Sequence, residues 1–200
     1  MKTLYTLAYP TLSIADMLRV EELRHIHDAN CEHVQAHFTM VFSCGDVDEH
    51  AYMEHVRSVS QAAQPISYVC RYAMLGADEA EQAYIFLVPD EGYTDLSRLH
   101  DALYRGLLAE RLRLEIPYVP HITIGSTTDR GAAKRLCDDL NERGLDIQGT
   151  VDALTVATLE ELKIRNLATF YLGVLVAAKN RGYSPRRNHD PRRSAERWQP

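Results

Sequence analysis

Apolar and polar residues alternate with period two along two short stretches of the chain. Residues 37–40 read His-Phe-Thr-Met and residues 121–124 read His-Ile-Thr-Ile. Because successive side chains of a strand point to opposite faces, each stretch predicts a β-strand with a histidine and a threonine on one face and two apolar residues on the other. We expect the apolar face of each strand to be buried.

The rest of the pattern predicts helices and strands in a repeated order. Apolar residues at helical spacing predict helices from residue 11 or 13, from 47 to 63, from 94 or 95 to 113 with Thr94 as N-cap, and from 132 to 143. Shorter apolar runs predict strands at residues 3–9, 67–75, 83–88, 147–159 and 167–178. Turn-forming residues 76–79 should join 67–75 and 83–88 as an antiparallel hairpin. Two similar lobes, each giving one histidine strand to a shared cleft, would explain this order.

The first helix carries an apolar stripe. Ile14, Met17 and Leu18 share one side, which we expect to face inward, and Leu23 and Ile26 could continue it. Charged residues, Arg24 among them, occupy the other side and are expected to face water.

Composition sets the class of protein. The chain has 200 residues, of which 46% are hydrophobic and 25% charged, enough to bury a core in one domain or two small lobes. No apolar run approaches about 18 residues, and the N-terminus lacks the cleavage site of a signal peptide. We therefore expect a cytoplasmic protein that does not enter a membrane.

Charge is divided unevenly along the chain. Residues 179–200 carry seven Lys/Arg against two Asp/Glu, which leaves 15 against 26 for residues 1–178. The basic segment is nearly without apolar residues, so we expect a folded domain over residues 1–178 and a disordered tail over 179–200. Such a tail could hold RNA electrostatically, although a merely solvated end is the commoner case.

A metal site and a cysteine nucleophile are the alternatives that the sequence offers. His25, His27, Cys31 and His33 are close together in the chain, but side chains two apart diverge on a helix and no second pair at zinc-binding spacing follows. The four cysteines are far apart and none forms a Cys-x-x-Cys pair, so we expect reduced thiols. Surface histidines are the simpler interpretation, and we expect no metal.

Two His-x-Thr stretches rarely arise together by chance. From the residue frequencies, about 0.2 copies of His-apolar-Ser/Thr-apolar are expected in the chain, and two copies have a joint chance of about 0.02. No other His-x-Ser/Thr occurs among the nine histidines.

The paired stretches resemble the signature of the 2H phosphoesterase superfamily, which includes 2′-5′ RNA ligases and 2′,3′-cyclic phosphodiesterases. Its pattern, His-hydrophobic-Ser/Thr-hydrophobic, is matched twice, and the resemblance covers about residues 1–178. It implies a bilobal α+β fold, with two antiparallel β-sheets lining a central cleft and helices outside. It also implies His37 and His121 as catalytic residues, Thr39 and Thr123 as phosphate-binding residues, and no metal or cofactor.

The chemistry of phosphodiester cleavage favours the same residues. A proton must leave the attacking hydroxyl or water while another reaches the leaving oxygen, and two histidines with pKa values near 6.5 can serve as base and acid. Threonine hydroxyls beside them can donate hydrogen bonds to phosphate oxygens. We expect a 2′,3′-cyclic phosphate or a 2′-5′ linkage as substrate, with hydrolysis or its reversal as ligation.

The choice of substrate stays open at this point. Some 2H enzymes have an arginine soon after the second motif, whereas here the first nearby one is Arg130. The acidic body favours a small nucleotide or an RNA terminus over long RNA, and we expect a monomer. A non-catalytic RNA- or nucleotide-binding protein that retains the fold is the alternative.

Overall fold

The computed structural model describes residues 2–77 and 82–173. Its helices are α1 (Ile14–His27), α2 (Glu49–Ala62), α3 (Tyr93–Leu103) and α4 (Arg130–Arg143), with a 3₁₀ helix at Gly106–Arg111. Its strands are β1 (Leu4–Ala8), β2 (Thr11–Leu12), β3 (Phe38–Cys44), β4 (Ile66–Ala77), β5 (Ala83–Glu91), β6 (Ile122–Thr127), β7 (Ile147–Val151), β8 (Ala153–Glu160) and β9 (Lys163–Tyr171). The predicted tail, 179–200, and the end of the last predicted strand lie outside the described residues.

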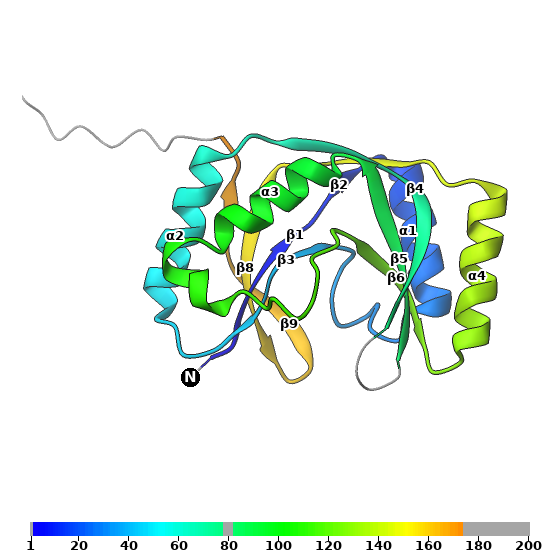
Figure 1. Cartoon of the computed structure of the whole chain (residues 1–200), viewed down its shortest axis with the longest axis horizontal. Helices are drawn as coiled ribbons and strands as arrows, with labels where there is room; N and C mark the ends of the chain where they lie inside the picture. Colours follow the sequence, from blue (N-terminus) through cyan, green and yellow to red (C-terminus); the bar gives the residue numbers. More distant parts are fainter. Residues whose placement is uncertain (1, 78–81, 174–200) are drawn as a thin grey trace, which may run out of the picture.

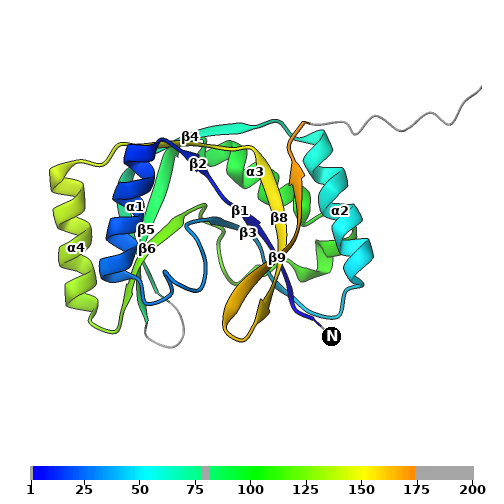
Figure 2. The same ribbon diagram turned by 180° about the vertical axis from the view of Figure 1, so that it is seen from behind.

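The strands form one curled antiparallel sheet with two halves. Its order is β2-β7-β4-β5-β6-β3-β1-β8-β9, and β6 meets β3 at a single residue pair, Phe38 and Ile122. Helices α1 and α4 cover the half that contains β4 to β6, while α2 and α3 cover the half that contains β1, β3, β8 and β9 (Figures 1 and 2). The predicted α+β class with helices outside is confirmed. The two expected sheets are joined at the Phe38–Ile122 pair.

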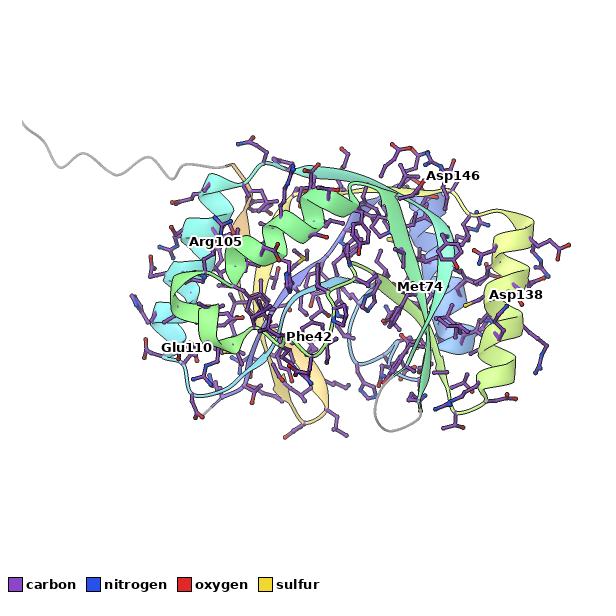
Figure 3. The ribbon with its side chains drawn as sticks, viewed as in Figure 1. Phe42, Met74, Arg105, Glu110, Asp138 and Asp146 are labelled. Carbon is purple, nitrogen blue, oxygen red and sulfur yellow. The ribbon has the colours of Figure 1, made fainter. Side chains whose placement is uncertain are left out.

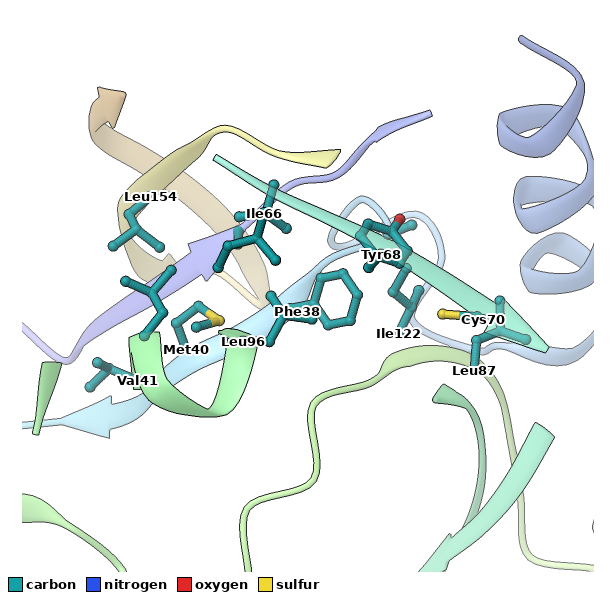
Figure 4. Packing of buried hydrophobic residues seen from close by; sticks show 14 of the residues in the cluster. Phe38, Met40, Val41, Ile66, Tyr68, Cys70, Leu87, Leu96, Ile122 and Leu154 are labelled. Carbon is teal, nitrogen blue, oxygen red and sulfur yellow. The ribbon is translucent and has the colours of Figure 1, made fainter. Parts of the chain in front are cut away.

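The apolar faces of the two histidine strands meet in the core at this junction. Phe38, Met40 and Ile122 are fully buried, as the alternation predicted. The ring of Phe38 packs edge-to-face on Tyr68 of β4, with centroids 5.0 Å apart (Figure 4). Burying these side chains removes a large apolar area from water, so the core fixes how the two strands lie against each other.

Helix α1 begins as predicted but buries the opposite face. Ser13 caps it by accepting a hydrogen bond from the Asp16 backbone N–H. Ile14 and Leu18 are 76% and 62% exposed, whereas Val20 and Arg24 are buried, so the predicted inward stripe is wrong. The physical reason is that α1 packs on β6 and that Arg24, on its buried side, pairs with Asp28 and donates to the carbonyl of Val34.

The predicted helix over residues 94–113 is interrupted. Helix α3 begins at Tyr93 after Gly92, so Thr94 is not its N-cap, and it ends at Leu103. Gly106 adopts φ +55°, which favours glycine, and the 3₁₀ helix that follows buries Leu108. The long apolar pattern therefore belongs to two short elements.

The remaining elements mostly follow the pattern. Strands β4 and β5 form the predicted antiparallel hairpin. The segment predicted as one strand at 147–159 is two strands, because β7 pairs with β4 while β8 pairs with β1 and β9. None of the helices that the structure describes is long and apolar enough to cross a membrane.

Candidate active site

The two histidines lie just before the strands that join the halves of the sheet. His37 precedes β3 and His121 precedes β6, next to the antiparallel pair Phe38–Ile122. One residue further along this register, His37 lies opposite Thr123 and Thr39 lies opposite His121. The four side chains share one face, and the histidines are diagonal neighbours, which are about 7–8 Å apart in regular antiparallel geometry.

Both imidazoles make the same hydrogen bond to their own chain. Nδ1 of His37 lies 2.7 Å from the carbonyl oxygen of Gln35, and Nδ1 of His121 lies 2.6 Å from that of Val119. A carbonyl oxygen only accepts, so Nδ1 carries the proton in each ring. Nε2 is therefore the titrating nitrogen of both histidines, able to accept a proton when neutral and to donate one when charged.

Burial holds both histidines toward the neutral form. It lowers the pKa of His121 from 6.5 to about 4, an effect that the bond to Val119 opposes and a charge on His37 reinforces. Burial also lowers the pKa of His37, with Gln35 and the Asp28 carboxylate acting against it and Arg24 with it. Charging one imidazole disfavours charging the other, so the two titrate as a pair.

The threonine hydroxyls are placed to meet a ligand. Thr39 and Thr123 are half-buried beside the histidines. Within residues 2–77 and 82–173, neither hydroxyl has a hydrogen-bond partner. Each can donate to an oxygen of a bound molecule without giving up a bond inside the protein.

Two aromatic residues near the histidines were missed or only loosely indicated by the sequence. The ring of Phe86 on β5 stacks on His121 with centroids 3.7 Å apart and planes at 26°. Tyr9, one of several tyrosines that could stack a base, packs edge-on to His37 at 6.2 Å and donates a hydrogen bond to Asn166 of β9. Tyr118, which lies three residues before His121 in the chain, stacks on His100.

The loop that delivers His37 is held by a buried ion pair. Arg24 Nη2 lies 3.2 Å from an Asp28 oxygen and donates to the carbonyl of Val34 at 2.6 Å. Both charged side chains are at most 3% exposed. On the other side of the loop, the backbone N–H of Ile164 in β9 donates to the carbonyl of His33. These bonds fix the backbone three and four residues before His37.

We expect Arg24→Met to destabilise the fold by about 3–5 kcal/mol, because it leaves the buried Asp28 carboxylate without its charged partner and with the Asn30 backbone N–H as its remaining donor. Urea unfolding would measure the change. The matched control is Arg143→Met, which removes an exposed pair with Asp139 at the same i, i+4 spacing and should cost less than about 1 kcal/mol. The double variant Arg24→Met/Asp28→Ala should recover part of the loss. Equal effects at Arg24 and Arg143 would contradict this account.

The histidines and cysteine considered for zinc do not assemble a site. His25 Nδ1 lies 4.0 Å from Cys31 Sγ, and α1 ends at His27, before His33. Across the described ranges, no three His, Cys, Asp or Glu side chains come together in a way that could hold a metal ion. All four cysteines are free thiols.

A curled antiparallel sheet whose two halves each give a His-x-Thr strand to one face is the arrangement that the resemblance to the 2H phosphoesterase superfamily implied. A family model described as the 2′-5′ RNA ligase superfamily matches residues 10–162, and the chain belongs to this superfamily. A search among curated proteins found no match.

Several solved structures have the same fold as this chain. TT0787 of Thermus thermophilus superimposes with a TM-score of 0.57 at 15% identity, covering 86% of this chain and 98% of that one. LigT of E. coli complexed with 3′-AMP gives 0.54 at 13%, covering 86% and 98%. LigT complexed with NADP⁺ gives 0.53 at 15%, covering 86% and 99%. At such identities the likeness shows the fold alone.

Proposed function

We propose that this protein is a metal-independent phosphoesterase that acts on a 2′,3′-cyclic phosphate or a 2′-5′ phosphodiester, by hydrolysis or by the reverse ligation. His37 and His121 act as general acid and base, and Thr39 and Thr123 bind the phosphate oxygens. The observation that carries the proposal is the pair of Nδ1 hydrogen bonds to Gln35 and Val119, which leaves both Nε2 atoms free for proton transfer.

The surroundings of the two histidines support one division of the roles. When the pair holds one proton, that proton resides mainly on the imidazole with the higher pKa. Burial lowers the pKa of both imidazoles, that of His121 to about 4, and the stacked ring of Phe86 shields His121 further, whereas among the described residues no ring stacks on His37. His37 is therefore the general acid that protonates the leaving oxygen, and His121 is the base that takes the proton of the attacking water or hydroxyl.

A nucleotide or an RNA terminus is the substrate class that we propose. The LigT structures with 3′-AMP and NADP⁺ contain nucleotides bound to that protein, which supports a ligand of this class here. Residues 1–178 carry 26 Asp/Glu against 15 Lys/Arg, and exposed side chains such as Asp138 and Asp146 are directed to solvent (Figure 3). Such a surface repels a long polyanion more than a small one. We further propose a monomer that works in the cytoplasm.

The pH profile should be bell-shaped with an acidic optimum. kcat/KM reports the free enzyme, in which charged His37 exists only below its lowered pKa and neutral His121 only above about 4. For a nucleoside 2′,3′-cyclic phosphate we expect log(kcat/KM) to peak between about pH 4 and 6.5 and to fall about tenfold per pH unit on each side. The kcat profile should lie at higher pH, because the bound phosphate anion raises both pKa values.

The same rates should be measured in excess chelator. A metal-dependent hydrolase would lose activity there at every pH, whereas a two-histidine enzyme keeps its profile. A single sigmoid that rises with pH and survives the loss of His121 would mean that only one base acts. A protein that binds the cyclic nucleotide but shows no turnover at any pH would instead support the non-catalytic alternative.

A further inference from the structure

Phe86 on β5 stacks on His121, which lies just before the neighbouring strand β6. It lies opposite Thr123 in the antiparallel pairing of β5 with β6, which makes His121 its diagonal neighbour on the same face. Its half-buried ring lies nearly parallel to the imidazole, with centroids 3.7 Å apart. One face of the imidazole is therefore covered by carbon and closed to water.

Strand β4, which pairs with β5, has a glycine where a side chain would collide with the ring of Phe86. On β4, Met74 pairs with Phe86 and Gly76 pairs with Tyr84; Met74 is labelled in Figure 3. A Cβ added at Gly76 would lie 2.5 Å from Cζ of Phe86 and closer still to its Cε2, which no real contact allows. Any side chain at position 76 would displace the ring, so the glycine and the ring form one packing unit.

The first histidine has different surroundings. Among the ring contacts of the described residues, none is a stack on His37; Tyr9 meets it edge-on at 6.2 Å and 67°. Near His37 there is also the buried Arg24–Asp28 ion pair, whose guanidinium reinforces and whose carboxylate opposes the effect of burial on its pKa. Two histidines with matching motifs and matching backbone hydrogen bonds are thus held in unlike environments.

We propose that Phe86 is a positioning residue for His121: its ring fixes the plane of the imidazole and shields one face from water, and Gly76 provides the room for it. This inference rests on the proposed function for its effect on catalysis, but its effect on His121 is independent of any substrate. A neutral imidazole loses little by such shielding, whereas an imidazolium loses solvation.

A second force acts in the opposite direction and makes the inference testable. The face of a phenyl ring attracts a cation, which would favour charged His121. Leucine keeps much of the apolar cover but has no π-face, and alanine removes both. If shielding dominates, Phe86→Ala raises the pKa of His121 and Phe86→Leu changes it little. If the attraction dominates, Phe86→Leu lowers that pKa further.

The experiment is an NMR titration of the His121 ring proton in the full-length protein without ligand. We expect the midpoint to rise by about one pH unit in Phe86→Ala and in Gly76→Ala, and to stay within about 0.3 in Phe86→Leu. Tyr84→Leu is the control, because Tyr84 is the next ring on β5 and stacks on Phe86 rather than on His121. An unchanged midpoint in Phe86→Ala, or a lower one in Phe86→Leu, would overturn the proposal.

Kinetics then separates this inference from the proposed function. With a 2′,3′-cyclic nucleotide, the acidic limb of log(kcat/KM) in Phe86→Ala should move to higher pH by the same amount as the titration midpoint, while the limb in Tyr84→Leu stays in place. A shifted midpoint with no turnover in any variant, wild type included, would reject the phosphoesterase and leave Phe86 as the residue that positions His121. An acidic limb that stays in place in an active Phe86→Ala would reject the catalytic part of the inference.

Discussion

Replacing His37 or His121 by alanine should lower kcat on a 2′,3′-cyclic nucleotide by about 10²- to 10⁴-fold, because each variant removes either the acid or the base of one proton-transfer step. Among the described residues, each imidazole makes a single hydrogen bond, from Nδ1 to Gln35 or Val119, so the loss of stability should stay near about 1 kcal/mol. Steady-state kinetics and urea unfolding of the same samples would measure both effects.

The double variant tests whether the two histidines act together. Residues that work in one step show non-additive losses, so His37→Ala/His121→Ala should be little slower than the slower single variant. His50→Ala, an exposed histidine on α2, is the control and should keep full activity. Wild-type turnover in either single variant would refute the two-histidine mechanism. Unfolding of both variants would point instead to structural histidines.

The sequence predicted the histidine strands because the signal is local. Alternation places His37 and Thr39 on one face and Phe38 and Met40 on the other, whatever the strand pairs with. The buried face of β3 then had to meet an apolar partner, and the second strand with the same pattern supplies Ile122. The resemblance to the family rests on the same local pattern, which occurs at residues 37–40 and again at residues 121–124.

The buried face of α1 could not be predicted in this way. An amphipathic pattern shows that a helix has two faces, and the apolar one is expected to be buried unless a specific partner changes the balance. Here the partners are Asp28 and the Val34 carbonyl, which receive the Arg24 guanidinium in the loop before His37. The i, i+4 spacing of Arg24 and Asp28 was visible in the sequence, but such pairs are usually exposed.

The contact of Phe86 with His121 depends on pairing between distant segments. It exists because β5 pairs with β6 in one register and because β4 has a glycine beside the ring. Register is set by the fold as a whole, so no local pattern predicts which aromatic residue reaches the imidazole. The available signal was weak: an aromatic residue at alternate positions 84 and 86, facing a glycine in the hairpin.

Replacing Thr39 or Thr123 by valine should lower kcat by about 10²- to 10³-fold with little change in stability. Valine keeps the shape of threonine and suits a strand, but it removes a hydroxyl that can donate to the phosphate oxygens as negative charge develops on them. Continuing the register by one residue on each side of the Phe38–Ile122 pair puts Thr123 opposite His37 and Thr39 opposite His121, so we expect each donor to lie beside the histidine of the other half. The effect should appear mainly in kcat, since a bond that strengthens in the transition state affects kcat more than KM.

Serine at the same positions is the matched variant. It keeps the hydroxyl and loses only a methyl group, so Thr39→Ser and Thr123→Ser should stay within about tenfold of the wild-type kcat if hydrogen bonding to the phosphate is the role of these residues. A loss in the serine variants as large as in the valine variants would show that the methyl group, and therefore packing, is what matters. Valine variants with wild-type kcat but raised KM would restrict the threonines to binding, because a contact equally strong in the ground state and the transition state leaves kcat unchanged.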